Sequence, residues 1–157
     1  MKKYELTSEF KVNILGKKVF RIKALINIEK YGVKNGDLGG YIEKEDNLSH
    51  YGDAWVYGDA WVCGNARVYG NARVYGDAEV CGDADYTTIK GFGTCNRTTT
   101  FFRCKDNTIK VACGCFLGTI DEFREQVKKT RTGKVAEEYL MIADLMEKHF
   151  EREEENE

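Results

Sequence analysis

A six-residue repeat runs without a break from Tyr51 to Tyr86 and constrains the fold more than any other feature of the chain. The repeats read YGDAWV, YGDAWV, CGNARV, YGNARV, YGDAEV and CGDADY. Valine recurs at one position and alanine at another, and both residue types suit a narrow interior. Each repeat also has a glycine followed by Asp or Asn, which tolerate turn geometry. The pattern therefore predicts one short strand and one corner in every repeat.

A period of six with a glycine in each repeat is typical of a β-helix, in which every repeat lays one strand along one face of a coil. With three faces to a turn, one turn takes about 18 residues, so residues that far apart should be neighbours on parallel strands. Trp55 then lies beside Arg73 as a cation–π candidate, and Arg67 lies beside Asp85 as an ion-pair candidate. The same register stacks Tyr51 on Tyr69, Tyr57 on Tyr75, and Cys63 on Cys81.

The spacing from valine to alanine, as from Val56 to Ala60 and from Val62 to Ala66, resembles the left-handed β-helix, or hexapeptide-repeat, superfamily. The resemblance implies a left-handed parallel β-helix. Members of that superfamily are commonly homotrimers, and they include acyltransferases, zinc-dependent carbonic anhydrases and many proteins with no enzymatic role. The resemblance therefore predicts a fold and an assembly rather than a reaction.

The rest of the chain predicts further elements on either side of the repeat. Three segments are expected: an N-terminal β cap at residues 1–38, the left-handed parallel β-helix at 39–86, and a C-terminal α+β segment at 87–157. A glycine at Gly16 between two β-rich runs indicates a hairpin in the cap. In the last segment we expect a β-hairpin around Asp106 and a helix that begins with a capping box of Thr119 and Glu122. A second helix is expected at about 134–151.

Composition favours one compact protein. The chain has 157 residues, of which 42% are hydrophobic, and a net charge of −2, which argues against bulk binding of nucleic acid. The N-terminus has no apolar run, so we expect no signal peptide and no membrane span, and residence in the cytoplasm of a bacterial host. Cys95, Cys104, Cys113 and Cys115 do not form a C-x-x-C pair, so neither a metal nor a cofactor is expected.

Catalytic residues are not apparent in the sequence. An acyltransferase of the superfamily uses a histidine as general base, and His50 and His149 are the only histidines. His50 falls in the valine register, which predicts that it points inward unless the entry repeat is out of phase, and His149 falls on an exposed face of the last predicted helix. A carbonic anhydrase of this fold needs three histidines for its zinc, which the chain cannot supply in that pattern. An acyltransferase-like enzyme that uses His50 stays an alternative.

Ligand binding is the better-supported chemistry. Large aromatic residues expected on the outside of the coil need a cover, either from a homotrimer or from a ligand or partner between subunits. Arginines near aromatic rings can hold a phosphate and stack a base, as a small nucleotide site requires, although a solvated hairpin face is the alternative for those after residue 87. The candidate ligand-binding residues are Trp55, Tyr57, Trp61, Arg67, Tyr69, Arg73, Arg97 and Arg103.

Two sequence segments outside the repeat suggest where the gene for this chain comes from. The runs DLGGYIEKEDNLSH and GFGTCNRTTTFFRCKDN are similar to those of small proteins carried by bacteriophages and prophages. Together with the scaffold, this resemblance implies a non-enzymatic, phage-derived trimeric binding protein that antagonises host defence. Its target would be a sequestered nucleotide signal or a defence protein. The alternatives are an acyltransferase-like enzyme and a structural phage component.

Overall fold

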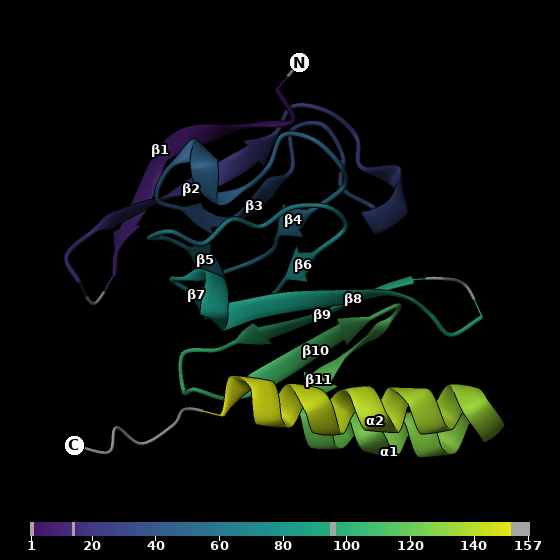
Figure 1. Cartoon of the computed structure of the whole chain (residues 1–157). Helices are drawn as coiled ribbons and strands as arrows, with labels where there is room; N and C mark the ends of the chain where they lie inside the picture. Colours follow the sequence, from purple (N-terminus) through teal and green to yellow (C-terminus); the bar gives the residue numbers. More distant parts are fainter. Residues whose placement is uncertain (1, 14, 95–96, 152–157) are drawn as a thin grey trace, which may run out of the picture.

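The computed structural model describes residues 2–13, 15–94 and 97–151. It shows a mainly β protein with two helices, as the sequence predicts (Figure 1). The N-terminal strands and the repeat lie at one end, an antiparallel sheet lies in the middle, and both helices lie side by side at the other end. No helix in the described part of the chain is long and apolar enough to cross a membrane.

The N-terminal residues form the predicted hairpin and join the repeat in one sheet. The five strands lie in the order β1 (Tyr4–Val12), β2 (Lys18–Ala24), β3 (Leu38–Ile42), β5 (Trp61–Val62) and β7 (Glu79–Val80). Strands β1, β2 and β3 pair antiparallel, whereas β3, β5 and β7 pair parallel. Gly16 has a φ of 78° in the hairpin turn, a conformation that glycine adopts without strain. Short 3₁₀ helices, η1 (Glu29–Tyr31) and η2 (Glu45–Asn47), follow β2 and β3.

Residues 18 apart in the repeat are neighbours on parallel strands, as predicted. Trp55 of β4 (Trp55–Val56) pairs with Arg73 of β6 (Arg73–Val74), and Trp61 pairs with Glu79. The valine column is buried, and the alanine column is buried from Ala54 to Ala78, whereas Ala84 is exposed. These strands are two residues long, and they divide between the five-stranded mixed sheet and a separate pair, β4 and β6. The sheets thus differ from the three long parallel sheets of a regular β-helix.

The C-terminal segment has more strands than the sequence predicts. A third 3₁₀ helix, η3 (Asp83–Asp85), leads into an antiparallel sheet. Its strands are β8 (Tyr86–Phe92), β9 (Arg97–Arg103), β10 (Ile109–Cys113) and β11 (Phe116–Thr119), in the order β11-β10-β9-β8. Strands β9 and β10 form the expected hairpin, whereas β8 and β11 extend it on both sides. The sequence predicted a two-stranded hairpin here, and this prediction was wrong because the sheet has two further strands.

Both helices begin close to where the sequence predicts. The capping box at the start of α1 (Ile120–Thr130) is present: Thr119 Oγ1 accepts from the Glu122 N–H at 3.1 Å, and Glu122 Oε1 accepts from the Thr119 N–H at 2.9 Å. Helix α2 (Gly133–Phe150) buries an apolar face made of Tyr139, Ile142, Ala143, Met146 and Phe150. This face packs on α1 and on the middle sheet.

Strand β9 of the middle sheet is buried on both faces. Phe101 and Phe102 are adjacent in β9, and both are 0% exposed. Phe101 packs with the helices and lies edge-on to Phe123 of α1, whereas Phe102 belongs to the core of the repeat. Because successive side chains of a strand point to opposite faces, one strand connects the two cores.

Candidate functional site

Arg73 is the outward residue of β6, and the middle sheet covers it. Its neighbour Val74 points into the coil and is 0% exposed. The Arg73 backbone N–H donates to Thr100 Oγ1 of β9 at 3.1 Å, which ties this turn of the repeat to the sheet below. Arg73 itself is only 9% exposed. An arginine in a surface register is therefore a buried residue here.

The guanidinium of Arg73 lies among tyrosine rings without an acidic partner. It is 4.9 Å from the ring centre of Tyr31 and 5.8 Å from that of Tyr75, and its Nη1 donates to Tyr75 Oη at 3.4 Å. Its Nε is buried without a hydrogen-bond partner, and among the described residues no carboxylate lies within 4.0 Å of it. Burial of a cation is costly unless an anion or hydrogen-bond acceptors compensate it. An anion bound beside Arg73 would therefore compensate the cost of burying its charge.

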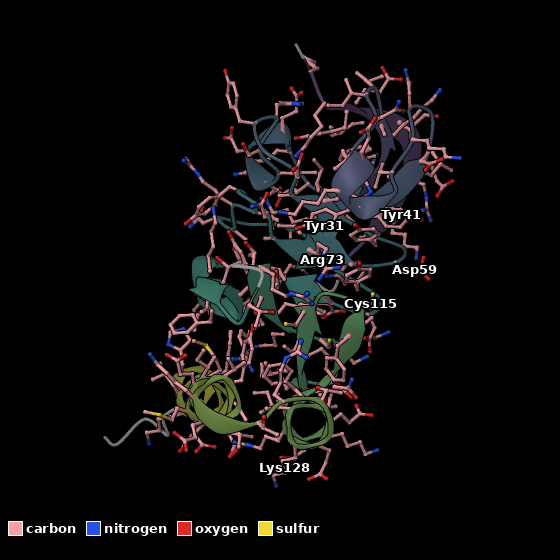
Figure 2. The ribbon with its side chains drawn as sticks, turned by 90° about the vertical axis from the view of Figure 1, so that its right-hand side faces the viewer. Tyr31, Tyr41, Asp59, Arg73, Cys115 and Lys128 are labelled. Atoms are coloured by element: carbon pink, nitrogen blue, oxygen red, sulfur yellow. The ribbon has the colours of Figure 1, made fainter. Side chains whose placement is uncertain are left out.

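Arg73 opens onto a cleft of about 760 Å³ between the repeat and the middle sheet. Residues from three parts of the chain form its walls: Lys30, Tyr31, Arg73, Tyr75, Arg97, Thr98, Gly114, Cys115, Phe116 and Leu117. Figure 2 labels Tyr31, Arg73 and Cys115, one below another, where these parts meet. The cleft therefore has three cationic side chains and several aromatic rings.

A glycine in the turn between β10 and β11 makes room for Arg97. A Cβ built on Gly114 would lie 1.9 Å from Arg97 Nη1, so a side chain at this position would displace the guanidinium. Gly114 also has a φ of 59°, which disfavours other residues. The lack of a side chain at Gly114 thus allows the Arg97 guanidinium to lie against this turn at the edge of the cleft.

The hydroxyl groups of Tyr31 and Tyr75 make different hydrogen bonds. Tyr31 donates its hydroxyl proton to Asn71 O at 2.6 Å, and this bond holds the ring against Arg73. Burial raises the pKa of Tyr31, and the positive charge of Arg73 opposes the shift. Tyr75 stacks on Tyr57, with ring centres 4.1 Å apart and an interplanar angle of 9°. Tyr75 accepts from Arg73, so its hydroxyl proton is left to donate.

The structure brings two of the predicted site residues, Arg73 and Arg97, into one cleft. Tyr57 lies behind Tyr75, and burial raises its pKa. Arg67 and Tyr69 are exposed and line a separate cleft of about 570 Å³ with His50. Two of the cleft residues, Tyr31 and Lys30, were missed because they come from the N-terminal segment and no pattern connects them to the repeat. Tyr75 was missed although it stacks in the predicted tyrosine column.

Neither tryptophan lines the cleft around Arg73. Trp55 was expected to point outward, but it is 1% exposed, because its ring meets Tyr4 edge-on at 6.4 Å and Gly39 lies against it. The N-terminal segment of the same chain thus covers it. Trp61 is half-buried and packs on Val19 and Tyr41. The expected contact of Arg73 with Trp55 is replaced by its contacts with tyrosines.

Arg103 has a structural role. It is 8% exposed, and its Nε donates to Asp85 Oδ1 at 3.0 Å. Its Nη2 donates to Phe150 O, also at 3.0 Å, which holds the end of α2 against the sheet. Asp85 therefore pairs with Arg103 rather than with Arg67, its expected partner.

His50 is held by both ring nitrogens. It was expected to point inward, but its ring is half-buried and stacks on Tyr4 with centres 4.2 Å apart. Nδ1 accepts from the Lys3 N–H at 3.1 Å, and Nε2 lies 3.0 Å from Glu45 Oε1. Because Nδ1 is the acceptor, Nε2 carries the proton that Glu45 accepts. This arrangement leaves His50 no free nitrogen to act as a general base.

Within residues 2–13, 15–94 and 97–151, no three His, Cys, Asp or Glu side chains converge as a metal site would require. Cys95, one of the cysteines weighed from the sequence, lies outside the described residues.

Comparison with known families gives one partial match. The family model described as YdcK Beta solenoid repeat matches residues 66–82, which include Arg73 and Tyr75. No curated protein matches the chain. The similarity thus concerns the repeat and extends to neither flanking segment.

Proposed function

We propose that the chain is a non-enzymatic binding protein whose cleft around Arg73 takes a phosphate-bearing, nucleotide-like small molecule. The buried guanidinium of Arg73, without a carboxylate partner among the described residues, carries the proposal. Phosphate oxygens match the planar donors of arginine, and Arg97 and Lys30 add positive charge at the rim. The rings of Tyr75 and Phe116 offer faces on which a base can stack.

For the scaffold, we infer that residues 39–86 wind as a left-handed parallel β-helix. The 18-residue register of Trp55 with Arg73, the buried valine column and the match to a solenoid repeat support this proposal. So do the positive φ angles of the repeat glycines, which suit corners. A crystal structure tests it, because right-handed winding of these turns would contradict it.

The repeat supplies a matched pair of variants for the binding test. Arg67 and Arg73 occupy the same position of successive repeats, but Arg67 is exposed and lies outside the cleft. Arg73→Met keeps a side chain about as long as the aliphatic stem of arginine and removes the charged guanidinium, and Arg67→Met makes the same change at an exposed residue. Titration calorimetry of the full chain with ADP and with pyrophosphate then separates the contribution of the base from that of the phosphates.

We expect Arg73→Met to weaken ADP binding by roughly 10- to 100-fold, since a hydrogen bond to a charged group contributes about 1.5–3 kcal/mol. Arg67→Met should leave ADP binding unchanged. Tighter binding of ADP than of pyrophosphate would support stacking of the base. Equal effects of the two variants, or no binding to the wild-type protein, would overturn the proposal.

The expected homotrimer and phage origin are separate proposals. The cleft proposal is argued from residues of one chain and is independent of the trimer proposal. Tyr51 and Tyr69 are 87% and 66% exposed, which favours a partner on that face. Native mass spectrometry of protein purified from its producing cells reports the subunit number and any retained ligand together. A monomer would refute the trimer and leave the cleft proposal standing.

A further inference from the structure

Cys63 and Cys81 occupy the same repeat position on successive turns, directly after the paired residues Val62 and Val80. The Cys63 N–H donates to Val80 O at 2.8 Å, and the sulfur atoms of Cys63 and Cys81 lie 2.8 Å apart, within hydrogen-bond distance. The backbones of the two turns also approach each other closely beside the thiols. A Cβ atom built on Gly64 would lie 2.3 Å from Cys81 O, which is too close for a side chain. The two thiols are therefore held together by the register of the coil.

The surroundings of the pair favour one thiolate. Asn13 Nδ2 donates to Cys63 Sγ at 3.6 Å, while Asn13 Oδ1 accepts from two N–H groups of its own hairpin turn. Hydrogen bonding with Cys81 and with Asn13 lowers the pKa of Cys63, whereas hydrogen bonding with Cys63, together with burial, raises the pKa of Cys81. Cys63 is 2% exposed, and the half-buried Cys81 lies nearer to solvent.

We propose that Cys63 and Cys81 are an oxidation site at which a hydroperoxide closes a disulfide between two successive turns of the coil. The Cys63 thiolate attacks one peroxide oxygen, the O–O bond breaks, and a sulfenic acid forms as hydroxide leaves. The Cys81 sulfur then attacks the Cys63 sulfur, the S–O bond breaks, and the Cys81 proton leaves with that oxygen as water. Two thiols and one hydrogen peroxide thus become one disulfide and two waters.

The backbone geometry can accept the bond. Adjacent strands lie roughly 4.8 Å apart, and a disulfide joins Cα atoms that are roughly 4.4–6.8 Å apart. The turns therefore need little movement to form the bond. The other cysteines of the described ranges, Cys104, Cys113 and Cys115, have no described thiol within hydrogen-bond distance. Cys113 contacts the hydroxyl of Thr99 instead.

Peptide mapping tests the proposal directly on the wild-type protein. Trypsin cleaves after Arg67 and Arg73, so Cys63 leaves in residues 45–67 and Cys81 in residues 74–90. The folded full chain is treated with hydrogen peroxide, free thiols are alkylated, and the digest is analysed by mass spectrometry without reduction. We expect the two peptides to be joined, with the loss of two hydrogens, before other cysteine pairs appear.

Two variants define the control outcomes. Cys115→Ser removes the exposed thiol at the cleft and should leave the 45–67 to 74–90 link unchanged. Cys81→Ser should abolish the link and leave Cys63 as a sulfenic acid that dimedone labels. The proposal is overturned if the folded wild-type protein keeps both thiols alkylatable after peroxide, or if Cys63 joins another cysteine in preference to Cys81.

Discussion

Arg73→Met should not destabilise the protein, although it removes a buried side chain. The variant loses two ring contacts, each about 0.5–1 kcal/mol, and a hydrogen bond that is long at 3.4 Å. It also removes a buried charge without a carboxylate partner among the described residues, and the desolvation of such a charge costs several kcal/mol. Since methionine retains the packing of the aliphatic stem, we expect the free energy of unfolding to stay level or to rise by about 1 kcal/mol.

Urea denaturation in phosphate-free buffer measures this change. The control Arg67→Met, on the surface, should alter the free energy of unfolding by less than about 0.5 kcal/mol. With ADP at about 100 times its dissociation constant, the wild-type protein should gain about 2.7 kcal/mol, and Arg73→Met should gain much less. A loss of about 3 kcal/mol or more in Arg73→Met without ligand would refute the reasoning, because it would indicate that Arg73 is part of a satisfied buried pair.

Three further predictions concern the scaffold. Thr119→Ala should lose about 1 kcal/mol of stability in urea, whereas Thr119→Ser should keep the cap. Trp55→Ala should lose about 3–5 kcal/mol because Trp55 is 1% exposed, and a thermal midpoint as high as that of Tyr69→Ala would contradict its burial. Burial lowers the pKa of Lys3 from 10.5 to about 8. Above pH 8 the unfolded chain therefore binds more protons than the folded chain. We expect the free energy of unfolding of the wild-type protein, measured relative to that of Lys3→Met, to rise by up to about 3 kcal/mol by pH 10.5. A difference between the two proteins that does not change with pH would contradict this.

Local patterns predicted much of the fold. The six-residue period predicted which residues are neighbours, and the pairing of Trp55 with Arg73 confirms that register. The box of Thr119 and Glu122 predicted the start of a helix because both partners lie within four residues of each other. Each of these patterns depends on residues that are close in sequence or separated by a fixed repeat.

The errors arose where distant segments meet. Position in the repeat predicted that Trp55 faces outward, but the pattern holds no information on whether Tyr4 covers it. Arg73 and Arg97 were both named from the sequence, yet only the middle sheet brings them to the same cleft. Tyr31 had no signal, since its hydrogen bond to Asn71 spans 40 residues.

The cleft has walls from both sides of the repeat, with Tyr31 from the segment before it and Arg97 from the sheet after it. The number of turns in the repeat therefore sets the distance between these two walls. Adding one turn of about 18 residues would move these walls apart by roughly one strand spacing, about 4.8 Å, and would leave each repeat internally unchanged. Under the proposed binding function, gaining or losing whole turns would therefore change the size of the cleft.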